Sequence, residues 1–310
     1  MKRAILLTAL CAGVIAFAAA SCKRHEPQSP QGKNVITVVT SLFPLYDFAR
    51  AVGKENVAVS LLLPPGVEAH SFEPRPGDIL KINSADLFIY TGAVMEPWVA
   101  KILQAMENKD LLVIDASAGI RLLQEAPDSG EERHGTDPHI WLDLENAQHM
   151  VDTIGAGLSA KDPLNRKFYT DSARSYKARL AELDSRYWSV LAACKRRVII
   201  HGGHFAFGYL AKRYSIDYRA AYGFSPDAEP TPRRLYELSE FIKRSGVQYI
   251  FYEELLNPRV AETIARETGA QLLKLSAAHN LSKQEMEQGV TFTAIMEQNL
   301  KNLSRGLECR

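Results

Sequence analysis

Residues 165–194 read NRKFYTDSARSYKARLAELDSRYWSVLAAC and contain neither glycine nor proline. Apolar and aromatic residues recur in this stretch at alternating steps of four and three, at Tyr169, Ala173, Tyr176, Leu180, Leu183, Tyr187 and Val190. This spacing places one apolar stripe on one face of an α-helix. A helix of 30 residues spans about 45 Å. The stretch predicts either a coiled-coil arm or a stiff connector that packs along two lobes.

The sequence on either side of this helix favours the connector. Apolar β-like runs alternate there with amphipathic stretches, which predicts an α/β fold with mainly parallel sheets. The predicted strands are 35–40, 57–63, 87–90 and 111–115 in the first half, and 197–201, 217–221, 249–252 and 271–275 in the second. The predicted helices are 46–52, 77–83 and 98–106, then 205–213, 233–245, 258–268 and 288–303.

These patterns predict three structural parts in the mature chain. Residues 34–162 form an amino-terminal α/β lobe, 163–196 the linking helix and 197–310 a carboxy-terminal α/β lobe. Each lobe is expected to hold a mainly parallel sheet flanked by helices, and the linking helix acts as one long rigid backbone. Asp162-Pro163 favours a helix start, with aspartate as N-cap and proline at the first helical position.

The amino terminus has the composition of a secretory signal. A basic start is followed by an uncharged run from Ala4 to Ala20, which is short for a stable membrane span. The segment Ala19-Ala20-Ser21-Cys22 resembles a lipobox, so residues 1–21 are predicted to be removed and Cys22 to carry lipid. An ordinary signal cut near Ala20 is the alternative. Residues 22–33 are polar and are predicted to be a tether.

The charge and the cysteine content further restrict the possible binding partners and the state of the cysteines. Removal of residues 1–21 leaves 35 basic against 36 acidic residues, with no basic block among aromatics, so nucleic-acid binding is not predicted. Cys194 and Cys309 remain after Cys11 is lost and Cys22 is lipidated. In an oxidising compartment they form either a disulfide or two unpaired thiols.

Three histidines occur in similar settings, each where a strand-like run gives way to a loop or a helix start. They are His70 in GVEAHSFEP (66–74), His139 in DPHIWLD (137–143) and His204 in HFAFGYL (204–210). Imidazole is a common ligand of zinc, and three imidazoles from separate segments can enclose one ion. Asp137 and Asp143 flank His139 and are candidates to accept its second ring N–H.

Other histidines are weaker candidates. His201 is a rival of His204, and His279 follows the last predicted strand as a possible fourth ligand, with water or a carboxylate as alternatives. His134 lies in a polar insertion and is read as a weak metal-gathering residue or as having no role. His25 lies in the tether, and His149 is expected at the surface.

The three histidine motifs resemble, in order and spacing, the metal-binding substrate-binding proteins of zinc and manganese ABC transporters, the cluster A-I family. The likeness continues through Ser225-x-x-x-Glu229-Pro230, Phe251-Tyr252-Glu253, Ala261-Glu262-Thr263-Ile264-Ala265 and Met296-Glu297-Gln298-Asn299-Leu300. It implies two α/β lobes joined by one long rigid helix, with metal held between them by His70, His139 and His204. It also implies a membrane permease as partner.

The chain departs from the manganese-preferring members at two places. They tend to have a carboxylate where this chain has His204, and an aspartate after the last strand that is absent here. A shell rich in imidazole suits zinc better than manganese. Zn²⁺ is therefore the predicted ion, with Mn²⁺ the less favoured one.

The predicted protein is a monomeric, extracytoplasmic lipoprotein that captures zinc and delivers it to an ABC importer, and it is not an enzyme. It is expected at the cell membrane or facing the periplasm. Two alternatives remain. A secreted zinc hydrolase would use Glu68 or Glu253 as base, and a metal-dependent surface adhesin would need no chemistry at all.

Overall fold

The computed structural model describes residues 35–124, 135–224, 226, 229–253 and 255–310. The predicted signal, the tether, Cys22, His25 and His134 lie outside the described residues. No helix in the described part of the chain is both long and apolar enough to cross a lipid bilayer.

The first half forms a parallel sheet of order β2-β1-β3-β4. Its strands are β1 (Ile36–Thr40), β2 (Val57–Leu61), β3 (Leu87–Tyr90) and β4 (Leu112–Asp115). Its helices are α1 (Phe43–Gly53), α2 (Pro76–Ser84), α3 (Val99–Gln104) and α4 (Leu144–Lys161), with short 3-10 turns η1 (Lys54–Asn56), η2 (Ile140–Leu142) and η3 (Pro163–Asn165). The strands are nearly continuous apolar runs because helices cover the sheet on both faces.

The second half repeats this arrangement with the sheet order β6-β5-β7-β8. Its strands are β5 (Val198–His201), β6 (Asp217–Ala220), β7 (Tyr249–Tyr252) and β8 (Gln271–Lys274). Its helices are α6 (Gly208–Arg213), α7 (Pro232–Ser245), α8 (Arg259–Thr268), α9 (Lys283–Glu287) and α10 (Phe292–Gly306). The predicted α/β class, with two parallel sheets, is confirmed.

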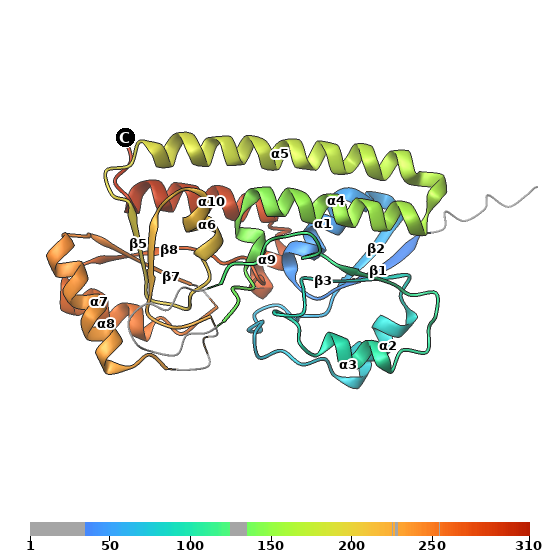
Figure 1. Ribbon diagram of the computed structural model, residues 1–310, viewed down its shortest axis with the longest axis horizontal. Coiled ribbons are helices and arrows are strands. Elements are labelled where there is room, and N and C mark those ends of the chain that lie inside the picture. The colour runs from blue at the N-terminus through green and yellow to red at the C-terminus, as the bar shows by residue number, and fades with distance from the viewer. Residues whose placement is uncertain (1–34, 125–134, 225, 227–228, 254) are drawn as a thin grey trace, which may run out of the picture. The chain divides into compact units, whose positions relative to one another are not determined.

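The long helix α5 (Arg166–Ala192) runs past both sheets (Figure 1). It packs against α1 and α4 from the first half and against α10 from the second. Six of the seven residues of the predicted stripe are buried, and Val190 is partly buried against the core. The connector is therefore the correct reading of this stretch, and a free coiled-coil arm is wrong.

The helix start differs in detail from the prediction. Pro163 begins the 3-10 turn η3, and α5 proper begins three residues later at Arg166. The Asp162 carboxylate accepts hydrogen bonds from the Asn165 side-chain amide at 2.7 Å and the Tyr169 hydroxyl at 2.8 Å. Asp162 thus fixes the corner between α4 and α5 through side chains.

Helix α4 is absent from the predicted helices because two glycines interrupt its pattern. A Cβ on Gly155 would approach the Cβ of Ala173 to 3.2 Å, and one on Gly157 would meet Ile114 Cδ1 at 2.0 Å. Glycine in a helix interior is unfavourable by propensity. Here it allows α4 to lie close to α5 and to the first sheet.

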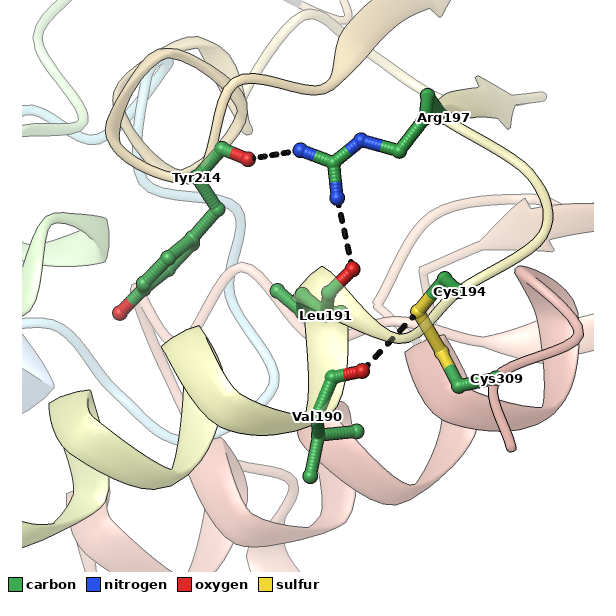
Figure 2. The surroundings of a disulfide bond; sticks show 6 residues. All are labelled: Val190, Leu191, Cys194, Arg197, Tyr214 and Cys309. Atoms are coloured by element: carbon green, nitrogen blue, oxygen red, sulfur yellow. Dashed lines mark hydrogen bonds between the residues drawn. A yellow bond between two sulfur atoms is a disulfide. The ribbon is translucent and has the colours of Figure 1, made fainter.

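A disulfide joins Cys194, just after α5, to Cys309, just after α10 (Figure 2). The cysteines are 115 residues apart in sequence. The Arg196 N–H donates to the Leu307 carbonyl oxygen at 3.0 Å beside the bond. Of the two alternatives left by the sequence, the disulfide is the one found, and it ties the end of the long helix to the end of the chain.

Candidate metal centre

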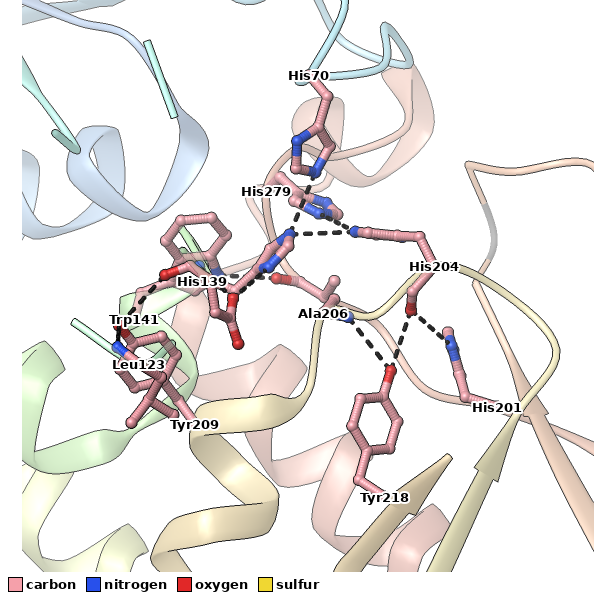
Figure 3. Close-up of polar contacts among 12 residues, drawn as sticks. His70, Leu123, His139, Trp141, His201, His204, Ala206, Tyr209, Tyr218 and His279 are labelled. Atoms are coloured by element: carbon pink, nitrogen blue, oxygen red, sulfur yellow. Dashed lines mark hydrogen bonds and ion pairs between the residues drawn. The ribbon is translucent and has the colours of Figure 1, made fainter. Parts of the chain in front are cut away.

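Four histidines from distant parts of the sequence meet at one point (Figure 3). One ring nitrogen from each of His70, His139, His204 and His279 lies within 4.8 Å of the others. His70 lies in the loop after β2, His139 precedes η2, His204 follows β5 and His279 follows β8. Loops at the carboxyl ends of parallel strands are the usual place for ligands in α/β sheets. The structure brings together the three predicted ligands and the candidate for the fourth.

The spacing of the nitrogens fits a tetrahedral zinc ion. The Nε2 atoms of His70 and His139 are 3.2 Å apart, those of His139 and His204 are 3.1 Å apart, and those of His204 and His279 are 3.2 Å apart. Zinc–nitrogen bonds of about 2.0–2.1 Å in a tetrahedron place the ligand nitrogens about 3.3 Å apart. The donor set therefore matches the size and chemistry of zinc.

Two carboxylates orient the buried imidazoles. Asp137 Oδ1 accepts from the ring Nδ1 of His139 at 2.7 Å and from its backbone N–H at 2.9 Å. Glu253 Oε1 lies 2.7 Å from His204 Nδ1. A proton held at Nδ1 leaves the lone pair of Nε2 free, and Nε2 is the atom that faces the cluster.

Burial keeps the clustered imidazoles neutral. Desolvation holds the pKa of His139 and of His279 well below the usual 6.5, and neighbouring histidines lower both further. Burial lowers the pKa of His204 to about 4, against a smaller opposing effect of Glu68. Imidazole must be neutral to bind a metal, so these three rings are in the binding form at neutral pH.

The loop at 276–281 connects the ligand segments of both halves. The Trp141 indole N–H donates to the Ala277 carbonyl oxygen at 2.8 Å. The Asn280 side-chain amide donates to the carbonyl oxygens of Pro64 at 2.7 Å and Val67 at 2.9 Å. The loops that carry His70 and His139 are thus both held by one loop of the second half.

The rival histidines lie outside the cluster. His201 is fully buried, and its Nδ1 lies 3.1 Å from the His204 carbonyl oxygen. Tyr218 donates its hydroxyl to that same oxygen at 3.0 Å (Figure 3), so both residues fix the His204 backbone. His149 is exposed as expected, with Nε2 2.7 Å from the Ala118 carbonyl oxygen.

Two carboxylates have roles other than those predicted. Asp143 does not contact His139. It accepts from the Glu145 N–H at 2.8 Å as the N-cap of α4, and it pairs with Arg213 at 3.0 Å. Glu253, predicted as a possible hydrolytic base, orients His204 instead. A catalytic zinc keeps one position open for water, whereas the cluster here offers a fourth imidazole, that of His279.

Fold and site together define a two-lobed α/β protein whose imidazole cluster has the geometry for a transition-metal ion. A family model described as "Zinc-uptake complex component A periplasmic" (ZnuA) matches residues 38–306, so the chain belongs to that family. Family membership confirms the predicted class, the extracytoplasmic role in metal uptake, and the prediction that the chain is not an enzyme.

Known proteins of this kind are similar over almost the whole chain. The high-affinity zinc uptake system protein ZnuA of Bacillus subtilis is 34% identical, over 98% of this chain and 97% of its own. The Zn(II)-bound ZnuA-like domain of Streptococcus pneumoniae AdcA superposes with a TM-score of 0.77 at 34% identity, over 88% of this chain and 99% of the domain.

A third similar protein bears on the adhesin alternative. The laminin-binding protein Lmb of Streptococcus agalactiae superposes with a TM-score of 0.76 at 30% identity, over 88% of this chain and 99% of its own. It is described as a bifunctional protein with adhesin and metal transporting activity.

Proposed function

We propose that this chain captures one zinc ion with His70, His139, His204 and His279 and delivers it to the membrane permease of an ABC importer. The observation that carries the proposal is the spacing of the four ring nitrogens. Imidazoles from both halves of the chain surround the ion, so its binding links the two lobes. The ligands are 69, 65 and 75 residues apart in sequence, and the folded chain is needed to bring them together.

The ligand shell favours zinc over manganese. Four imidazoles supply nitrogen donors, and in the described residues the carboxylates of Asp137 and Glu253 face the outer ring nitrogens. Manganese prefers oxygen ligands and six-coordinate geometry, whereas zinc accepts four nitrogens in a tetrahedron.

Anchoring and organisation belong to the same proposal. Residues 1–21 are removed, Cys22 carries lipid, and residues 22–33 tether a monomer to the outer side of a membrane. The lobes are 34–162 and 197–310, with 163–196 as linking helix. Support comes from the lipobox-like Ala19-Ala20-Ser21-Cys22 and from the family description as periplasmic.

Zinc affinity of single-histidine variants tests the proposal. His139→Ala and His279→Ala each remove one donor, and both are expected to weaken zinc binding by orders of magnitude. His149→Ala, an exposed histidine outside the cluster, is the matched control and keeps wild-type affinity. Competition with a chromophoric chelator measures zinc, and parallel titration measures manganese. Unchanged affinity in His139→Ala, or stronger binding of manganese than of zinc, contradicts the proposal.

Adhesion is a second candidate function, favoured by the likeness to Lmb. Binding of the full chain to immobilised laminin, with and without zinc, is the test. Absence of saturable binding in both conditions removes this candidate and leaves metal capture untouched.

A further inference from the structure

A second hollow of about 630 Å³ lies away from the histidine cluster. It is formed by α1, β2 and α5 together with residues 289–293, which precede and begin α10. None of the four clustered histidines lines it. Elements of both halves and the connecting helix therefore border one cavity that metal binding does not use.

Basic side chains from α1, η1 and α5 line this hollow. Helix α1 contributes Asp47 and Arg50, the turn η1 that follows it contributes Lys54, and α5 contributes Ser172 and Arg179. Positions three, four and seven apart lie on one face of a helix. Three cations, one each from α1, η1 and α5, thereby border one cavity.

These three cations are exposed and are not held by salt bridges within the described residues. Arg50, Lys54 and Arg179 form no salt bridge with a described carboxylate, although Arg50 lies over the Tyr46 ring at 5.2 Å and Lys54 over the Phe168 ring at 5.6 Å. On α5, Arg166 also lacks a salt bridge within the described residues, whereas four other cations are paired with carboxylates: Lys167, Arg174, Lys177 and Arg186. Three cations without a salt bridge therefore lie at the hollow.

The Ser172 hydroxyl adds a hydrogen-bond donor to the same wall. Ser172 is only 5% exposed, and its hydroxyl has no hydrogen-bond partner within the described parts of the chain. On the same helix, Thr170 and Ser185 each donate to the carbonyl oxygen four residues earlier at 2.9 Å. The Ser172 oxygen is open to solvent at the hollow, so water satisfies this hydroxyl until a bound ligand replaces that water.

Asp47, which lies close enough to Arg50 to feel its charge, is one carboxylate against three cations in the lining. The Asp47 carboxylate accepts from the Tyr176 hydroxyl at 2.8 Å and from the Phe292 N–H at 3.1 Å. Burial raises its pKa above the usual 3.8, which disfavours its charge. The lining therefore keeps an excess of positive charge beside free hydroxyl donors.

We propose that this hollow binds a multivalent oxyanion of the phosphate type, either free in solution or carried on a lipid headgroup. Arginine guanidinium groups and hydroxyls are the groups that recognise phosphate oxygens. The cations lie on both α1 and α5, so a bound oxyanion bridges these helices. The site is separate from the zinc ligands and stands without the proposed metal function.

Calorimetric titration of inorganic phosphate tests this inference. The full chain is purified in detergent and stripped of metal, so that binding of phosphate to zinc adds no heat to the titration. The double variant R50Q/R179Q is expected to bind phosphate at least about tenfold more weakly, because charge-assisted hydrogen bonds are lost. S172A, which preserves the shape of the wall, is expected to bind several-fold more weakly. Glycerophosphoglycerol, a soluble lipid headgroup, is titrated in parallel.

Two controls separate this site from other parts of the molecule. R174Q removes a paired cation from the same helix and keeps phosphate binding, as does H139A in the metal cluster. Absence of saturable phosphate and headgroup binding by the wild type overturns the proposal, and so does binding that R50Q/R179Q and S172A leave unchanged. Tighter binding of the headgroup than of phosphate supports the lipid source, and the reverse order supports a free anion.

Discussion

At the scale of single residues, a histidine binds zinc through one ring nitrogen, and the hydrogen bond of the other nitrogen selects which one is free. Asp137→Asn replaces the acceptor that lies 2.7 Å from His139 Nδ1. Loss of such an outer partner typically costs about 10- to 100-fold in metal affinity, and that loss is the expected result in a chelator competition assay. Asp143→Asn, six residues along the chain, is the control, because Asp143 caps α4 and does not contact His139. A drop of equal size in both variants would argue against orientation by Asp137.

A second residue-scale prediction concerns the buried Glu96, whose carboxylate accepts from the N–H groups of Thr91 at 3.2 Å and Gly92 at 3.0 Å. Burial raises the pKa of Glu96 to about 7, whereas an unfolded glutamate titrates near 4.3. Between these two pKa values, Glu96 is protonated in the folded state and ionised in the unfolded state. The resulting stabilisation is present below about pH 4.5 and is lost as pH rises through 7.

The measurement is denaturant unfolding of the wild type and of Glu96→Gln between pH 5 and pH 8. The unfolding free energy of the wild type is expected to fall relative to the variant by about 2–3 kcal/mol over this range, at 1.36 kcal/mol per pKa unit. The exposed Glu107→Gln serves as control, with a difference that stays constant. A constant difference for Glu96→Gln as well would show that Glu96 is ionised in the fold throughout.

Residue patterns predicted the ligands better than their partners. His70 and His204 stand out because each follows a strand-like run, a setting that His279 shares, and His139 stands out because it lies between Asp137 and Asp143. Glu253 has no such signal as a partner of His204, from which it lies 49 residues away in sequence. Their contact depends on β5 and β7 being neighbours in the sheet, and local sequence does not encode strand order.

At the scale of elements, the loop at 276–281 holds the ligand loops in place. Asn280→Ala removes two hydrogen bonds to the carbonyl oxygens of Pro64 and Val67 and frees the loop that carries His70. The zinc dissociation rate is expected to rise by about tenfold or more, since each lost bond is worth about 0.5–1.5 kcal/mol. Stopped-flow transfer of zinc to a chelator measures this rate.

Asn302→Ala is the matched control for this variant. The Asn302 side-chain amide donates to the Lys274 carbonyl oxygen at 2.8 Å, away from the ligand loops. Its removal is expected to leave zinc dissociation unchanged. Equal dissociation rates in wild type and Asn280→Ala would show that the His70 loop needs no support from the Asn280 side chain, beyond the bond from the Gly66 N–H to the Leu281 carbonyl oxygen.

The elements themselves were largely predictable. All eight predicted strands are found, with ends shifted by at most two residues, because buried parallel strands are short apolar runs. Helix α4 was not predicted. Its two interior glycines, Gly155 and Gly157, are required by close contacts with other elements, and such contacts cannot be read from the local sequence. Helices α6 and α10 begin three and four residues later than predicted, since the residues before them form loops.

At the scale of the whole molecule, several ties oppose a wide hinge. Helix α5 is continuous over 27 residues and packs against helices of both halves. The Tyr187 hydroxyl donates to the Met296 carbonyl oxygen at 2.6 Å, and the Cys194–Cys309 disulfide joins the ends of α5 and α10. On the first-half side, the Tyr176 hydroxyl donates to Asp47 at 2.8 Å. The connector is thus fastened to both lobes along its length.

These ties predict that zinc moves the loops and leaves the lobes in place. Spin labels at the exposed positions Leu80 on α2 and Tyr236 on α7 report the separation of the lobes. Their distance distribution is expected to be the same with and without zinc, because the long helix resists bending. A label pair at Val67 and Leu80 reports the His70 loop, and its distribution is expected to broaden when zinc is removed. A shift of several ångströms in the Leu80–Tyr236 distance would instead mean that the molecule closes like a hinge, and release would then need no loop movement.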